Sequence, residues 1–167
     1  SIPKDRFWLY RSQWNKTDHT LHVLPHWNWK EGQNLPVFVY TDYPSAELFV
    51  NGVSQGKVCK DVSQGLTDGN RRNPETLKRF RLMWNDVVYQ PGELRVVAYN
   101  ADGKAVAEKT IRTSGKAAAI KLTPDRTVLK ADGEDLCFVN VSLTDKDGNP
   151  VPVDNRLVMV KVSGAGR

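Results

Sequence analysis

The sequence predicts an all-β protein, with two β-sandwich modules in tandem preceded by one short N-terminal helix. Three observations predict this fold class. Apolar and polar residues alternate along short stretches, turn residues separate these stretches every ~8–12 positions, and the 167 residues exceed the ~100 of one sandwich. The 40% hydrophobic and 26% charged residues are ordinary for a globular protein.

The one predicted helix spans residues 3–14, within an N-terminal segment 1–18. Pro3 suits a first helical turn. Phe7, Tyr10 and Trp14 follow at positions i, i+3 and i+7, which places them on one apolar stripe. The segment is therefore predicted to be α-helical although the rest of the chain is β.

The first sandwich is predicted over residues 19–113. Its strands are marked by alternating residues at 35–40, 47–50, 80–84, 94–98 and 104–112. Asn51-Gly52 and Asp102-Gly103 supply tight turns between strands. The polar stretch 53–76 contains three glycines, so we expect a short strand at 55–60 followed by a long loop.

The second sandwich is predicted over residues 117–167, after a small-residue linker. Its strands are expected near 120–122, 137–143 and 158–162, with a turn at Asp147-Gly148. About 50 residues are too few for seven strands. We therefore expect a truncated module whose uncovered edge can pair with another copy of the chain.

The charge and cysteine content exclude several classes of function. The net charge is +5, but the basic residues are scattered, which does not favour nucleic-acid binding. The densest basic group is Arg71, Arg72, Lys78, Arg79 and Arg81.

No apolar run approaches the ~20 residues of a membrane span, and residues 1–6 do not begin a targeting signal. Cys59 and Cys137 are expected to be free, mostly buried thiols.

Two polar motifs resemble metal sites, but their spacing argues against metal binding. On a strand, His22 and His26 would lie ~13 Å apart, and His19 would face the other side. Asp145 to Asn149 begin like a calcium loop, but Pro150 replaces the required glycine. We therefore expect no metal and no cofactor.

Catalysis by the chain itself is not expected either. Glycosidase chemistry needs two facing carboxylates, whereas Asp42, Glu47 and Asp86 sit in turns or on alternating strands.

The aromatic residues are the best candidates for a functional surface. The chain has five tryptophans, and we expect Trp27 and Trp29 to share one strand face with Pro25. Aromatic faces can pack between modules or stack on sugar rings, and the sequence leaves both interpretations open. The candidates for carbohydrate binding or for a domain interface are His26, Trp27, Trp29, Trp84 and Tyr99.

A family resemblance rests on the segment Leu21-His22-Val23-Leu24-Pro25-His26-Trp27-Asn28-Trp29. It resembles the start of the immunoglobulin-like domain that follows the catalytic barrel in bacterial family 2 glycoside hydrolases. The stretches 37–41, 46–56 and 92–99 are similar to later strands of that domain. Residues 3–14 look like the last helix of the (β/α) barrel, and residues 117–167 like the next immunoglobulin-like sandwich.

The resemblance implies a non-catalytic accessory region that supports the upstream catalytic barrel of a β-galactosidase-like enzyme. The family's two catalytic glutamates lie on barrel strands, and no residue here matches their motifs. The resemblance also implies a periplasmic or extracellular parent enzyme. Two alternatives stay open: a carbohydrate-binding module that uses exposed tryptophans, and an adhesin-like repeat of the bacterial surface.

Overall fold

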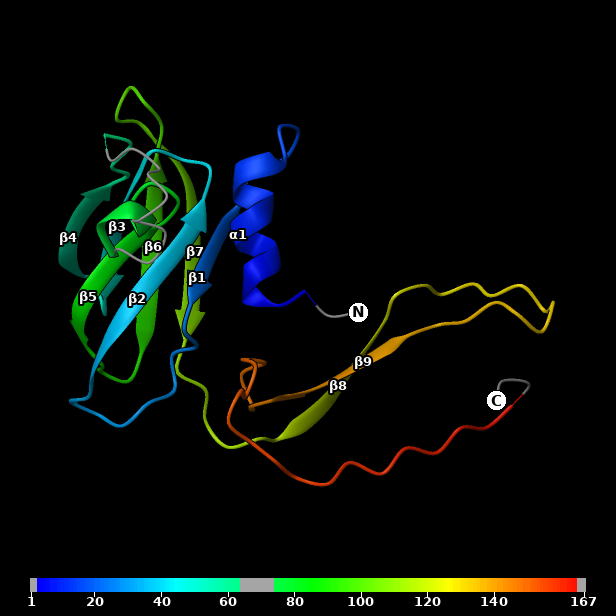
Figure 1. Ribbon diagram of the computed structural model, residues 1–167. Coiled ribbons are helices and arrows are strands. Elements are labelled where there is room, and N and C mark those ends of the chain that lie inside the picture. The colour runs from blue at the N-terminus through cyan, green and yellow to red at the C-terminus, as the bar shows by residue number, and fades with distance from the viewer. Residues whose placement is uncertain (1–2, 64–73, 165–167) are drawn as a thin grey trace. The chain divides into compact units, whose positions relative to one another are not determined.

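The computed structural model describes residues 3–63 and 74–164. The chain divides into two compact units, Ser1–Ser114 and Gly115–Arg167. The predicted all-β class is confirmed, with one helix of more than a single turn (Figure 1). The first unit contains α1 (Asp5–Trp14), β1 (Leu21–Leu24), β2 (Asn34–Thr41), β3 (Ser45–Val50), β4 (Val53–Cys59), α2 (Pro74–Leu77), β5 (Leu82–Val88), β6 (Glu93–Tyr99) and β7 (Ala105–Arg112).

The strands of the first unit form two antiparallel sheets, ordered β1-β2-β5 and β4-β3-β6-β7. Seven strands divided between two sheets are typical of an immunoglobulin-like sandwich. Here β4 pairs with β3, whereas the fourth strand of a constant-type domain joins the other sheet. The predicted hairpin at Asn51-Gly52 is confirmed, since both residues have the positive φ (48° and 82°) of a tight turn.

Alternate residues of the central strands fill the space between the sheets. The buried side chains include Leu35, Val37, Val39, Ala46, Leu48, Leu82, Trp84, Leu94, Val96 and Ala98. This alternation is what the sequence predicted, because successive side chains of a strand point to opposite faces. The first unit therefore has one continuous hydrophobic core between its two sheets.

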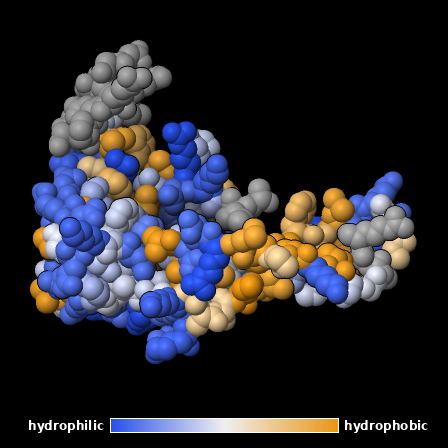
Figure 2. Space-filling model, turned by 90° about the horizontal axis from the view of Figure 1, so that it is seen from below, coloured by the Kyte–Doolittle hydropathy of each residue, from blue (hydrophilic) through white to orange (hydrophobic). Residues whose placement is uncertain are grey.

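Within its described residues, 115–164, the second unit has one two-stranded sheet, formed by β8 (Ala119–Pro124) and β9 (Val139–Thr144). Ile120 lies opposite Leu143 and Leu122 opposite Val141, so one face of the sheet is apolar. Much of that face is exposed, and Figure 2 shows hydrophobic side chains gathered over this unit. The strand predicted at 158–162 is wrong, because these residues pair with no neighbouring strand in the part of the chain that is described.

Three further sequence predictions need correction. β1 ends at Leu24, because Pro25 has no N–H to continue the ladder, so Trp27 and Trp29 share no strand face. Cys59 is exposed on β4, an edge strand, and Cys137 is half-buried, so neither thiol is in a core. The stretch predicted to be a loop also contains the short helix α2. Residues 64–73 of that stretch, which include Arg71 and Arg72, lie outside the described residues.

Candidate functional surfaces

Two of the predicted site residues belong to the core. Trp27 is only 1% exposed, packs edge-on against Tyr89 at 5.0 Å, and donates its indole N–H to the Gln90 carbonyl at 3.1 Å. Trp84 is buried on β5 and donates to the Gly56 carbonyl at 2.9 Å. A buried indole whose N–H is satisfied stabilises the sandwich. Neither ring is available to a ligand.

Tyr99 is half-buried on β6 and belongs to a polar cluster on one sheet. Its hydroxyl donates to Glu47 Oε2 at 3.1 Å, and Lys57 Nζ lies 3.9 Å from the ring centroid. Burial and the Glu47 carboxylate raise the pKa of Tyr99. Because Lys57 covers the ring, this residue offers little surface for stacking.

His26 and Trp29 are the remaining predicted residues, and they form a pair at the surface. Their rings are parallel within 3° and stack at a centroid distance of 4.7 Å. The Trp29 indole N–H also donates to the His26 carbonyl at 2.7 Å. Burial lowers the pKa of His26. The pair lies in the segment between β1 and β2, and Trp29 is still 39% exposed.

The largest exposed aromatic surface lies on α1. Trp14 is 73% exposed and Phe7 and Tyr10 are each 49% exposed. Tyr10 stacks on Trp14 at 4.9 Å, and both border an apolar hollow of about 250 Å³ beside Phe80. The predicted stripe is therefore real, and about half or more of each of its three side chains is exposed. We call Phe7, Tyr10 and Trp14 the outer face of α1.

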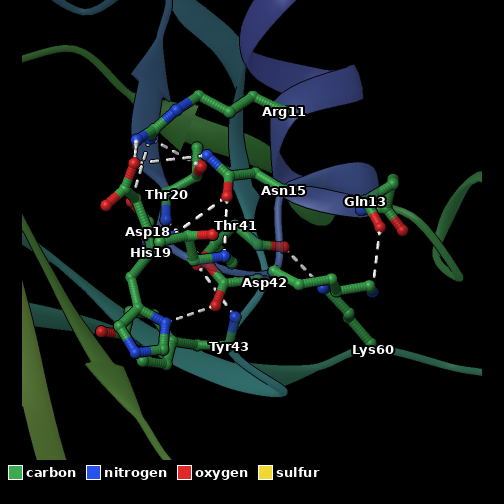
Figure 3. Close-up of polar contacts among 12 residues, drawn as sticks. Arg11, Gln13, Asn15, Asp18, His19, Thr20, Thr41, Asp42, Tyr43 and Lys60 are labelled. Atoms are coloured by element: carbon green, nitrogen blue, oxygen red, sulfur yellow. Dashed lines mark hydrogen bonds and ion pairs between the residues drawn. The ribbon is translucent and has the colours of Figure 1, made fainter.

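Polar contacts on either side of this stripe fasten α1 to the sandwich (Figure 3). Arg11 donates to the His19 carbonyl at 2.9 Å and to Thr20 Oγ1 at 3.0 Å. Gln13 reaches the Phe80 carbonyl at 3.2 Å. At the other end of the helix, Trp8 stacks on His22. These contacts fix the orientation of the helix and leave its aromatic stripe exposed.

Asp42 holds the loop that accepts Arg11. Its carboxylate accepts the Thr20 N–H and lies beside His19 Nδ1, each at 2.6 Å (Figure 3). Burial raises the pKa of Asp42, but the hydrogen bonds from Thr20 and His19 outweigh it, so the net shift is downward. Burial lowers the pKa of Lys60, which donates to the Thr41 carbonyl. A charged Asp42 therefore stabilises the attachment of α1.

The carboxylates considered for catalysis have structural partners instead. Glu47 accepts Ser54 Oγ at 2.6 Å, and Asp86 accepts the Asn34 amide at 3.3 Å. No group of His, Cys, Asp or Glu within residues 3–63 and 74–164 is arranged to hold a metal ion. Over the same residues, no helix has the length and apolar character needed to cross a membrane.

Two family models match the chain. Residues 32–107 match a domain of unknown function, DUF4982, and residues 120–167 match the glycoside hydrolase family 2 C-terminal domain 5. The fold and these matches define the class as the β-sandwich part of a glycoside hydrolase. More particularly, the chain belongs to the C-terminal region of glycoside hydrolase family 2 enzymes.

Full-length relatives and solved structures agree with this assignment. The β-galactosidase BoGH2A of Bacteroides ovatus is 43% identical over 99% of the chain, and a β-glucuronidase of Formosa agariphila is 26% identical over 98%. A β-glycosidase of Bacteroides vulgatus superposes with a TM-score of 0.73 at 30% identity over 90% of the chain. The chain spans only 17%, 15% and 17% of these three proteins.

Sequence reasoning missed the attachment of α1. Arg11, Thr20 and Asp42 are far apart in the sequence and follow no motif that would pair them. The only signal was a charged residue, Arg11, four positions after Phe7 and three before Trp14, which places it beside the aromatic stripe. The hollow beside Trp29 could not be predicted either, because it depends on how residues 24–38 fold back between β1 and β2.

Proposed function

We propose that the chain is a non-catalytic accessory region of a β-galactosidase-like family 2 hydrolase, and that it supports the upstream catalytic part of the same polypeptide. The observation that carries this proposal is the outer face of α1. A helix that Arg11 and Gln13 bond to the sandwich exposes three aromatic side chains. Exposed apolar surface of this kind marks an interaction site.

The relatives support a partner within the same polypeptide. More than four fifths of the Bacteroides ovatus enzyme lies outside the region that the chain matches. That larger part is long enough to contain a catalytic domain. Trp and Tyr are also the residues that dominate protein interfaces. The outer face of α1 would thus pack against the catalytic barrel and hold it in place. The predicted boundaries 1–18, 19–113 and 117–167 belong to this proposal.

Comparing the isolated chain with the longer polypeptide tests the proposal. The isolated chain should not hydrolyse an aryl β-galactoside, whereas the longer polypeptide should. Replacing Tyr10 and Trp14 by Ala should lower the thermal inactivation temperature of the longer enzyme by several degrees. The same change should shift the isolated chain by only about 1 °C, because both side chains are exposed there.

A matched control is Val53→Ala, which removes an exposed apolar side chain from the β3–β4 hairpin. Equal effects of the α1 variant on the isolated chain and the longer enzyme would contradict docking through α1. Hydrolysis by the isolated chain would contradict the accessory role. Cell fractionation would test the periplasmic or extracellular location that the resemblance implies.

The two alternatives differ in support. An adhesin-like repeat requires two similar modules, whereas the described residues give the first unit seven strands and the second unit two. A carbohydrate-binding role through buried Trp27 and Trp84 is not favoured. Among the tryptophans predicted to bind carbohydrate, Trp29 is the exposed one.

A further inference from the structure

An open hollow of about 350 Å³ lies beside Trp29 on the first unit. Its apolar walls include Pro25, from the segment after β1, and Pro36 and Phe38 from β2. Trp29 lines the same hollow while one of its faces stacks on His26. The volume falls at the small end of the ~300–1,000 Å³ usual for ligand sites.

The orientation of the Trp29 ring is set by the protein before any ligand arrives. Its N–H is bonded to the His26 carbonyl, and its stacking partner is held nearly parallel. An aromatic surface that is already ordered loses little conformational entropy when a ligand packs against it. The exposed indole is therefore a preformed flat wall.

The polar groups of the hollow are amides and not charges. Gln33 and Asn34 contribute them. The Asn34 amide donates to Asp86 at 3.3 Å, whereas Gln33 is exposed and its side chain has no hydrogen-bond partner among the residues that the structure describes. An amide offers both donors and an acceptor. A flat apolar wall with neutral hydrogen-bonding groups beside it suits a sugar ring, which has an apolar face and a rim of hydroxyls. The lining suits a neutral sugar better than an anionic one.

We propose that this hollow binds a neutral galactosyl unit of the carbohydrate on which the whole enzyme acts, with Trp29 stacked on the sugar ring and Gln33 bonded to its hydroxyls. The proposal rests on the β-galactosidase-like function proposed above. It assigns the chain a carbohydrate contact in addition to the interface on α1. The two features lie on different elements and can be tested separately.

A titration of the isolated 167-residue chain with a neutral β-galacto-oligosaccharide tests the site, with tryptophan fluorescence or ligand NMR as the signal. We expect saturable binding with a dissociation constant of about 1–10 mM. Trp29→Ala should weaken binding about tenfold or more, and Gln33→Ala about threefold. Trp29→Phe should retain part of the affinity, because a smaller aromatic face remains.

Trp14→Ala is the matched control, since it removes an exposed indole from α1 and should leave sugar binding unchanged. Circular dichroism shows whether each variant is folded. Absence of saturable binding, unchanged binding in folded Trp29→Ala and Gln33→Ala, or equal loss in Trp14→Ala would each overturn the proposal. Because the test uses the isolated chain, its result does not depend on docking through α1.

Discussion

His26, Trp27, Asn28 and Trp29 are consecutive, yet their side chains enter three environments. Trp27 fills the core, and Asn28 exchanges two hydrogen bonds with the Ser114 backbone, at 3.0 and 3.1 Å, which ties the start of the sandwich to its end. His26 and Trp29 form the surface stack. The motif predicted His26, Trp27 and Trp29 as candidates. Which of these side chains is buried and which is exposed could not be predicted, because that depends on where β1 ends and on contacts with distant segments.

Asp145 is a second residue whose role is local and testable. Its carboxylate accepts hydrogen bonds from Gly115, Asp147 and both the backbone and amide nitrogens of Asn149, at 2.8–3.1 Å. These bonds, the one from Gly115 first, lower the pKa of Asp145 to about 2. The Asp145 carboxylate therefore holds together the turn predicted at Asp147-Gly148.

The pH dependence of the second unit should follow from Asp145. A folded-state pKa below the unfolded value stabilises the fold above about pH 4, and that contribution is lost as the pH falls through about 2. Carboxyl NMR should show the Asp145 resonance titrating near pH 2, and Asp145→Asn should remove both the resonance and this part of the pH dependence. A midpoint near 3.8, the ordinary aspartate value, would contradict the hydrogen-bonded turn.

At the scale of elements, α1 shows what the sequence could and could not predict. The spacing of its aromatic residues correctly indicated a helix, because 3.6 residues per turn brings positions i, i+3 and i+7 together. It gave no information on which direction the stripe would face. The sandwich was predicted more completely, because alternation along a strand fixes both the element and its buried side.

The attachment of α1 predicts the effect of removing Arg11. A ten-residue helix is barely stable alone, so α1 depends on its contacts with the sandwich. Losing the bonds to His19 and Thr20 should cost about 1–2 kcal/mol and speed amide exchange in α1 about 5- to 30-fold. Hydrogen–deuterium exchange with mass spectrometry, resolved to residues 5–14, measures this.

The control for that experiment is Arg6→Ala on the same helix. Arg6 carries the same charge, is exposed, and has no hydrogen bond or ion pair within residues 3–63 and 74–164. Its removal should leave the exchange of α1 unchanged. If Arg6→Ala and Arg11→Ala accelerated exchange equally, helix charge and not the Arg11 contacts would account for the effect.

At the scale of the whole molecule, each unit exposes an apolar surface that can meet a protein partner. In the first unit it is the outer face of α1, and in the second it is the face of the β8–β9 sheet that carries Ile120 and Leu122. A sheet of two strands needs a second layer for stability. Pairing with another copy of the chain through this sheet stays a prediction, and the α1 surface is the one assigned to the catalytic part of the enzyme.

The solvent accessibility of Trp14 tests docking through α1 most directly. Hydroxyl-radical footprinting should oxidise Trp14 readily in the isolated chain, where its side chain is 73% exposed. In the longer polypeptide we expect its oxidation to fall severalfold, while buried Trp27 stays protected in both and reports that the sandwich is folded. Equal oxidation of Trp14 in the two proteins would contradict the proposal that α1 packs against the rest of the enzyme.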